Sequence, residues 1–196
     1  DAVVVEGPKA GGHLGYSAEQ LEDSDFVSYG LERIISDVIK EVGPDISVIA
    51  AGGIYTGKDI YNILKHGAAG VQMATRFVTT EECDAHPEFK QAYLNSSEED
   101  IVIIKSPVGM PGRAIRNNFL ETVMTKKIPF KCDYDCLKSC NPFNSPYCIA
   151  DALISAQKGN MEKGFVFAGT NAYRAEKIVS VKDVFDSLEA EYSNAS

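Results

Sequence analysis

The sequence has little positive charge for its length and no long hydrophobic run. Its 196 residues include 19 Lys and Arg against 28 Asp and Glu, which gives a formal net charge of −9. This balance argues against nucleic acid or an anionic membrane surface as a partner, since both need a basic face. No apolar run approaches the roughly 20 residues of a membrane span, so we expect no membrane partner either.

Other absences bear on the cellular location of the protein and on whether the chain is a fragment. We find no secretory signal, no low-complexity tract and no internal repeat. The five cysteines are an odd number, which favours reduced thiols in the cytoplasm over a disulfide framework. The chain begins at Asp1, without Met and already inside an expected strand, so we expect a fragment of a longer protein.

The first part of the chain predicts parallel βα units. Apolar runs indicate buried strands at Ala2–Glu6, Ile46–Gly53 and Ala69–Phe77. A polar loop follows the first strand at 16–25, and helices are expected at about 26–41 and 58–65. The first helix carries its core face on Leu31, Ile34, Ile35, Val38 and Ile39. This alternation is typical of an α/β protein.

The second part of the chain does not continue the alternation of strand and helix. A Gly/Pro turn in 108–124 should continue as a helix, with Ala114, Ile115, Phe119 and Val123 facing inward. The other elements that we expect are a helix within 86–95, a strand at Asp100–Ser106, a cysteine-rich loop at 132–148, a helix near Ile149–Gln157, an apolar run at 165–169 and a closing helix at Val181–Tyr192.

Paired glycines end two of the three expected parallel strands, at Gly11–Gly12 and Gly52–Gly53. Ligands of parallel α/β folds lie at the carboxyl ends of strands, where the next helix also begins. A phosphate there accepts hydrogen bonds from backbone N–H groups, and side chains would block its approach. The alternative reading is that these glycines only make tight turns between βα units.

Four stretches together carry a resemblance: "EGPKAGGHLG", "VIAAGGI", "GAAGVQMATRFVTTEECDAHPEFK" and "SPVGMPGRAI". They resemble the C-terminal half of the flavin-dependent nitronate monooxygenases, formerly called 2-nitropropane dioxygenases. The flavin-dependent enoyl-acyl-carrier-protein reductases share most of this pattern. The resemblance implies strands six to eight of an FMN-binding (β/α)8 TIM barrel, with a smaller, mostly helical lid.

Three regions follow from this resemblance: barrel βα units at 1–80, the lid with its cysteine-rich loop at 81–172, and a C-terminal helix at 173–196. Because a full barrel takes about 250 residues, the missing N-terminal half of the barrel is required as a partner. The resemblance does not decide the oligomeric state, for which a homodimer is one option.

The resemblance assigns the catalytic role to His13, in the glycine turn that would face the flavin. An imidazole titrates near neutrality and can take a proton from a nitroalkane carbon as general base. The alternative is that His13 only binds a loop carbonyl. The stretch departs from the family pattern at Lys9, where Glu is usual, and at Ala74, where glycine is usual. FMN contacts are implied for Gly11, Gly12, Gly15, Gly52, Gly53, Gln72, Met73, Ala74 and Thr75.

The remaining charged candidates are read as structural or left open. Arg76 can pair with a phosphate or form a salt bridge within the protein. His66 precedes Gly67 at an expected helix end, where a cation suits the helix dipole. His86 precedes Pro87 at an expected helix start. We assign no catalytic role to either histidine.

Four cysteines lie close together in the second part, with three, three and seven residues between them, at Cys132, Cys136, Cys140 and Cys148. In a helix the first three would share one face. Four thiolates can hold zinc or an iron–sulfur cluster, but the spacing is not the usual CxxC pairing. We therefore favour buried or reactive thiols and assign no metal ligand. Cys83 lies apart from this cluster.

The leading hypothesis is an FMN-dependent nitronate monooxygenase. It would oxidise a small nitronate or nitroalkane with O2 to a carbonyl compound and nitrite. One alternative is an FMN-dependent enoyl-acyl-carrier-protein reductase that uses NAD(P)H. Another is a non-catalytic fragment whose cysteine-rich loop binds metal.

Overall fold

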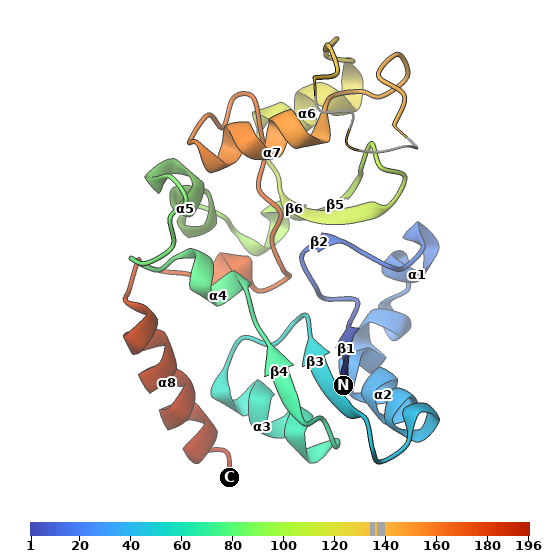
Figure 1. The fold of residues 1–196 in the computed structure, drawn as a ribbon. Coiled ribbons are helices and arrows are strands. Elements are labelled where there is room, and N and C mark those ends of the chain that lie inside the picture. The colour runs from blue at the N-terminus through green and yellow to red at the C-terminus, as the bar shows by residue number, and fades with distance from the viewer. Residues whose placement is uncertain (134–135, 137–139) are drawn as a thin grey trace.

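The part of the chain that the structure describes contains two small sheets, one above the other in Figure 1. The computed structural model describes residues 1–133, 136 and 140–196. The lower sheet is parallel, in the order β1-β3-β4, with β1 at Ala2–Glu6, β3 at Ser47–Ala51 and β4 at Gly70–Gln72. The upper sheet is antiparallel, in the order β2-β6-β5, with β2 at Gly12–His13, β6 at Pro111–Ile115 and β5 at Ile101–Lys105.

Both helices that the sequence predicts between the parallel strands are present. They are α2 at Ser24–Val42 and α3 at Gly57–Lys65. The expected inward face of α2 is confirmed, because Leu31 and Ile35 are buried in the lower core. Helix α2 is kinked at Gly30, whose φ of 50° is not helical. Helix α3 ends before Gly67, whose φ of 97° lies in the left-handed region that favours glycine.

The upper sheet is covered by helices α6 at Asn118–Thr125 and α7 at Ile149–Gln157, with α5 at Pro87–Leu94 beside them (Figure 1). Its core is aromatic, and Phe119, Tyr147 and Phe165 pack against one another. Short 3-10 turns occupy Glu98–Asp100 and Ala172–Arg174. No helix among the described residues is both long and apolar enough to cross a membrane.

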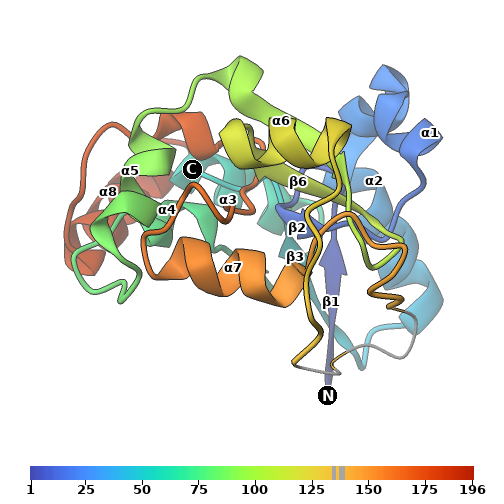
Figure 2. The same ribbon diagram turned by 90° about the horizontal axis from the view of Figure 1, so that it is seen from above.

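The last helix, α8 at Val181–Ser193, returns to the lower layer and packs on α3. The two backbones are so close that a Cβ on Gly57 would lie 2.1 Å from the carbonyl oxygen of Leu188. Figure 2, seen from above, shows α8 on the opposite side of the molecule from α1, at Ala18–Glu22.

The prediction that the first strand is buried on both faces is wrong for this chain. Strand β1 lies at the edge of the parallel sheet. Val5 is buried against α2, but Val4 is 52% exposed. The helices cover only one face, so the apolar character of β1 exceeds what this chain can bury.

The predicted strand at Ala69–Phe77 is too long. Strand β4 ends at Gln72, paired with Ala51, and the partner strand β3 ends there as well. The chain then turns into a short helix, α4 at Thr75–Val78, in which the Phe77 N–H donates to the Ala74 carbonyl at 2.9 Å. An apolar run alone does not separate these two conformations.

Ala114 and Ile115 face inward as predicted, but they lie in a strand and not in a helix. They belong to β6, the central strand of the upper sheet, and are 0% and 5% exposed. Helix α6 begins only at Asn118, because the Asn117 side chain accepts a hydrogen bond from the Leu120 N–H at 3.0 Å. Phe119 and Val123 do lie in this helix.

The expected polar loop at 16–25 contains a helix that the prediction missed, α1. A capping box starts it: Ser17 accepts from the Gln20 N–H at 3.2 Å, and Gln20 accepts from the Ser17 N–H at 2.9 Å. The glycine turn before it also holds strand β2, which pairs with Gly112 and Arg113 of β6. This pairing ties the loop between β1 and α2 to the upper sheet.

Candidate functional site

The carboxyl ends of the three parallel strands meet at one edge of the lower sheet. Glu6 is in register with Ala51, and Ala51 with Gln72. The structure therefore brings together three loops that the sequence singled out, after β1, β3 and β4. The expected cofactor residues in these loops are Gly11, Gly12, Gly15, Gly52, Gly53, Gln72, Met73, Ala74 and Thr75.

Gly52 and Gly53 are needed for close packing between two of these loops. Their φ angles are 86° and 80°. A Cβ on Gly52 would lie 2.7 Å from the Ala10 Cβ, and one on Gly53 would lie 2.8 Å from the Lys9 Cβ. The loop after β1 thus rests directly on the loop after β3.

A segment from the far end of the chain, 168–171, contacts all three loops, and no sequence motif predicted these contacts. The Gly169 N–H donates to Thr75 Oγ1 at 3.2 Å, and the Thr170 N–H donates to the Lys9 carbonyl at 3.2 Å. Asn171 Nδ2 donates to the Gly53 carbonyl at 2.8 Å. The fit is tight, since a Cβ on Gly11 would lie 2.5 Å from the Gly169 nitrogen.

Other parts of this edge remain accessible. Alanine at Gly12 or Gly15 would place its Cβ with no heavy atom within 4 Å. Helix α4 begins at the end of β4, and within the described residues no side chain caps it at Ala74. The first N–H groups of a helix have no partner inside the helix. Free donors and glycine backbone thus lie on the same edge.

His13 lies on β2 above this edge, half-buried. Its Nε2 is 2.7 Å from Ser106 Oγ. The imidazole and the Phe167 ring form a T-shaped contact, with ring centroids 4.9 Å apart. Burial lowers the pKa of His13, which favours the neutral imidazole, a ring with one N–H and one nitrogen lone pair. No loop carbonyl is its partner among the described residues, which leaves the general-base reading in place.

Ser106 and Arg113 are the residues around His13 that sequence reasoning missed. Ser106 is 3% exposed and follows β5. Arg113 is 5% exposed, pairs with Gly12 across the sheet and donates from Nη1 to the Ala10 carbonyl. Burial lowers the pKa of Arg113 to about 10, so its charge persists at pH 7. The buried, charged guanidinium of Arg113 thus fixes the glycine loop through the Ala10 carbonyl.

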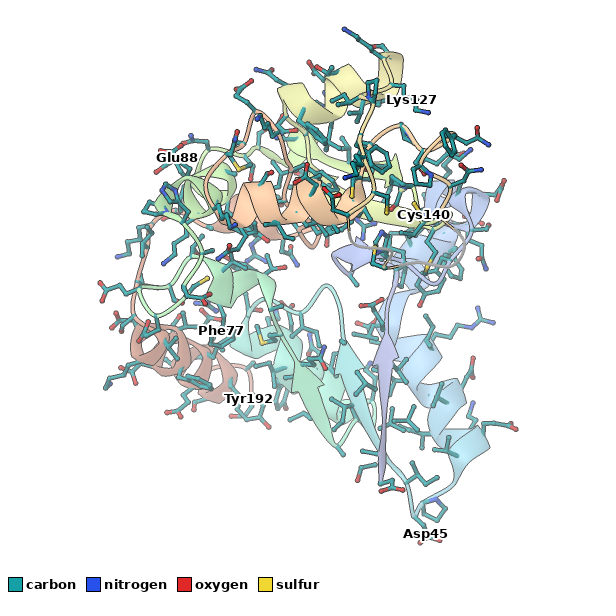
Figure 3. All side chains as sticks on the ribbon, turned by 45° about the horizontal axis from the view of Figure 1, so that its top comes forward. Asp45, Phe77, Glu88, Lys127, Cys140 and Tyr192 are labelled. Atoms are coloured by element: carbon teal, nitrogen blue, oxygen red, sulfur yellow. The ribbon has the colours of Figure 1, made fainter. Side chains whose placement is uncertain are left out.

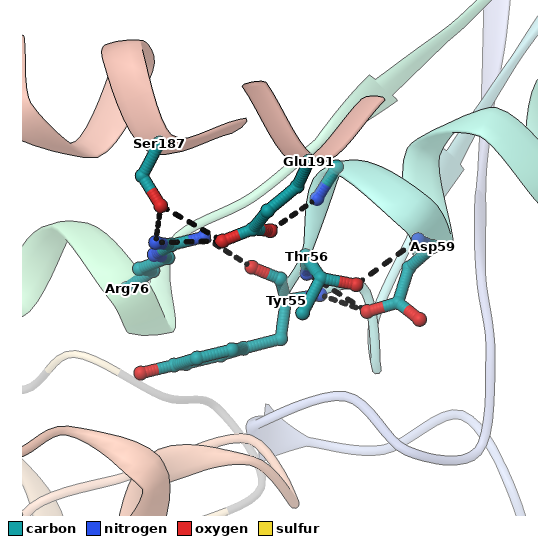
Figure 4. Close-up of polar contacts among 7 residues, drawn as sticks. Tyr55, Thr56, Asp59, Arg76, Ser187 and Glu191 are labelled. Carbon is teal, nitrogen blue, oxygen red and sulfur yellow. Dashed lines mark hydrogen bonds and ion pairs between the residues drawn. The ribbon is translucent and has the colours of Figure 1, made fainter. Parts of the chain in front are cut away.

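Arg76 forms a salt bridge within the protein, one of the two roles left open for it. Its guanidinium donates to the Tyr55 carbonyl at 3.0 Å and to Ser187 Oγ at 2.8 Å, and lies 3.5 Å from Glu191 (Figure 4). Glu191 also accepts from the Gly57 N–H at 2.7 Å. Burial raises the pKa of Glu191, but these hydrogen bonds and Arg76 outweigh it and lower the pKa.

The other two histidines sit at helix ends. His66 is the C-terminal cap residue of α3. His86 precedes α5, and its Nδ1 accepts from the Glu88 N–H at 3.2 Å. Both positions agree with the structural reading.

The five cysteines are free thiols. Cys132 and Cys136 are exposed, while Cys83, Cys140 and Cys148 are half-buried. Within the described residues, no three His, Cys, Asp or Glu side chains are grouped so that they could hold a metal ion. The helical arrangement considered for Cys132, Cys136 and Cys140 involves residues 134–135 and 137–139, which lie outside the described part. Figure 3 shows Cys140 and Lys127 at the opposite end of the molecule from Asp45.

Together, these features define an α/β protein whose three strand-end loops meet at one edge, with a half-buried histidine on β2. The nitronate monooxygenase family model matches residues 1–191. This chain therefore belongs to the nitronate monooxygenase family. A probable nitronate monooxygenase of Staphylococcus aureus (strain Newman) is 37% identical over 121 residues, which cover 62% of this chain and 33% of that protein.

Solved structures give a consistent match. The structure of FabK from Thermotoga maritima has a TM-score of 0.76 and 28% identity, over 99% of this chain and 55% of that chain. A nitroalkane oxidase from Streptomyces ansochromogenes has a TM-score of 0.69 and 25% identity, over 100% of this chain and 52% of that chain. The chain thus spans about half the length of these structures, and a third of the curated relative (33%).

Proposed function

We propose that this chain is the C-terminal part of an FMN-dependent nitronate monooxygenase and contributes strands six to eight of a (β/α)8 barrel. Residues 1–80 would hold the barrel units, 81–172 the lid, and 173–196 the closing helix. The parallel order β1-β3-β4 and the 52% exposure of Val4 on an edge strand support this. An N-terminal barrel half would pair with β1 and cover Val4.

The observation that carries the proposal is that three strand-end loops and the start of α4 lie on one edge, beside His13. Backbone N–H groups of glycine loops and helix N-termini are suitable donors for phosphate. The open space at Gly12 and Gly15 and the uncapped start of α4 therefore fit FMN. We assign its contacts to Gly11, Gly12, Gly15, Gly52, Gly53, Gln72, Met73, Ala74 and Thr75.

When bound, FMN supplies the electron transfer between the nitronate and O2. His13 prepares the nitronate by taking a proton from the carbon next to the nitro group. Ser106 Oγ engages Nε2 and orients the ring. Nδ1 has no hydrogen-bond partner among the described residues. We therefore assign the neutral ring the tautomer in which Nε2–H donates to Ser106 Oγ, so that the lone pair of Nδ1 accepts the substrate proton. The products are a carbonyl compound and nitrite.

The test uses the complete protein, including its upstream part. It should bind FMN, become yellow and consume O2 with nitroethane. His13→Ala should retain FMN and still oxidise preformed ethyl nitronate, but kcat/KM for neutral nitroethane should fall about 10²–10⁴-fold, the usual contribution of a general base. His66→Ala is the matched control, because this exposed histidine only ends α3.

The pH profile adds a second readout. A protonated imidazole cannot accept the substrate proton, so kcat/KM for nitroethane should fall at low pH. Because burial lowers the pKa of His13 from 6.5, the midpoint should lie below 6.5, and His13→Ala should abolish it. A protein that takes up no FMN, or a His13→Ala variant with unchanged nitroethane oxidation, would contradict the proposal.

A second candidate is the reduction of an enoyl-acyl-carrier-protein with NAD(P)H at the same edge. The observation that favours it is a cavity of about 530 Å³ beside Ser106, which has room for an acyl chain. NADPH oxidation by the complete protein with a crotonyl thioester, and no oxygen uptake with nitroethane, would support this candidate instead.

A further inference from the structure

A mostly apolar cavity of about 530 Å³ lies in the upper layer, between β5, α6 and the loop at 141–147. Its size is within the usual range of small-molecule sites. Ile103, Ile104, Leu120, Val123, Met124 and Tyr147 contribute its apolar walls. Two of these side chains are left in contact with water, since Ile103 is 40% and Met124 is 80% exposed.

One residue, Ser106, connects the cavity with the proposed site. Ser106 lines the cavity, and its hydroxyl lies 2.7 Å from His13 Nε2. A molecule whose reacting carbon lies at His13 can therefore extend a substituent past Ser106 toward α6. Lys105 and Asn144 also line the cavity and offer polar groups.

The chemistry of the walls selects the kind of substituent. A nitro compound as small as nitroethane would leave these apolar walls unfilled, and an unfilled apolar cavity is unfavourable. The Tyr147 hydroxyl is out of contact with solvent and has no partner among the described residues, so this wall offers a ring and not a hydrogen bond.

We propose that this cavity binds the alkyl chain of the substrate, so that the enzyme prefers nitroalkanes with a chain of several carbons over nitroethane. This inference rests on the proposed function. Each methylene moved from water into the cavity should raise kcat/KM about fourfold, the equilibrium factor for one buried CH2.

The experiment compares nitroethane, 1-nitrobutane, 1-nitrohexane and 1-nitrooctane with the complete, FMN-containing protein. We expect kcat/KM to rise along the series until the cavity is filled. Val123→Phe narrows the cavity from α6 and should lower the ratio of 1-nitrooctane to nitroethane about tenfold, equivalent to losing one to two buried methylenes. Thr122→Phe adds the same ring to the exposed side of α6 and should leave the ratio unchanged.

Ile103→Trp provides a second variant should Val123→Phe fail to fold, because Ile103 is partly exposed at the side of the cavity. Calorimetric titration with octanoate and acetate, carboxylates that resemble nitronates, gives a readout without turnover. Octanoate should bind more tightly, and Val123→Phe or Ile103→Trp should remove the difference.

The outcomes separate the two proposals. If nitroethane is oxidised but the chain-length series is flat in wild type and variants, the cavity inference is overturned and the function stands. If no nitroalkane is oxidised, the proposed function fails. Octanoate binding that Val123→Phe weakens would then still support an alkyl-chain site, and equal binding of octanoate and acetate would overturn it.

Discussion

Substituting Gly52 by Ala tests whether the glycine at the end of β3 serves packing within the chain. Gly52 has a φ of 86°, and a Cβ there would lie 2.7 Å from the Ala10 Cβ. An L-residue in the left-handed region costs about 1–2 kcal/mol. Overpacking at a well-packed contact costs about 1–3 kcal/mol more. We therefore expect Gly52→Ala to lower the free energy of unfolding by about 2–5 kcal/mol.

Two other glycines separate these contributions. Gly109 has a φ of 87° but open space around its Cβ position, so Gly109→Ala carries only the backbone cost of about 1–2 kcal/mol. Gly15 has neither a positive φ nor a neighbour within 4 Å, so Gly15→Ala should change stability by less than about 0.5 kcal/mol. The assay is urea unfolding of the complete protein without FMN, followed by circular dichroism.

The order of the three losses in free energy of unfolding shows whether Gly52 is needed for packing. If Gly52→Ala costs no more than Gly109→Ala, the close approach of Ala10 does not limit this position, and the packing explanation is refuted. An FMN titration of the same variants addresses the ligand explanation. Loss of FMN binding by Gly52→Ala at unchanged stability would assign this glycine to the ligand alone.

Two further predictions concern stability. Tyr147→Phe removes a buried hydroxyl that has no partner among the described residues, so it should leave the free energy of unfolding unchanged or raise it by about 1 kcal/mol. Tyr93→Phe loses a 2.7 Å hydrogen bond to the Phe167 carbonyl and should lower the free energy of unfolding by about 1–2 kcal/mol. A loss for Tyr147→Phe as large as that for Tyr93→Phe would mean that the Tyr147 hydroxyl has a partner. Glu191→Ala removes the acceptor at the start of α3 and should cost about 1–2 kcal/mol at pH 7, against about 0.5 or less for the exposed Glu189→Ala. Because the folded state lowers the pKa of Glu191 below 4.5, that cost should shrink as the pH falls through the folded pKa, and a cost that does not change with pH would contradict the role of the carboxylate charge.

The parallel sheet was predictable because each of its strands has a local signal. Apolar runs and glycines mark β1 and β3, and the helical repeat of Leu31, Ile35 and Val38 marks α2. The upper sheet was not predictable in the same way. Strand β2 is only Gly12–His13, too short to leave a pattern, and it exists because β6 pairs with it.

The same limit explains the wrong helix at Ala114 and Ile115. Four inward residues at Ala114, Ile115, Phe119 and Val123 fit one helical face as well as a strand followed by a helix. The capping side chain of Asn117 and the pairing of β6 with two strands decide between them. Asn117 was a local signal in the sequence, but the strand pairing depends on residues far away.

The candidate site, too, contains residues that a local motif predicts and residues that only distant contacts bring in. His13 and the glycines lie in short motifs, so they could be found from the sequence. Ser106 lies 93 positions from His13, and nothing in the sequence joins the two. The segment at 168–171 is farther still. Half of its hydrogen bonds to Lys9, Gly53 and Thr75 come from its backbone N–H groups, which leave no residue pattern.

The position of His13 is therefore a property of both sheets and not of the glycine motif alone. Gly112 pairs with His13, and a Cβ on Gly112 would lie 2.8 Å from Phe167 Cε1. Glycine at this position allows the Phe167 ring to lie against β6 and to contact the imidazole ring. Ser106, which follows β5, restricts the rotation of the imidazole ring through its hydrogen bond with Nε2. The glycine turn places the histidine near the strand ends, and residues of the upper sheet decide which way the imidazole faces.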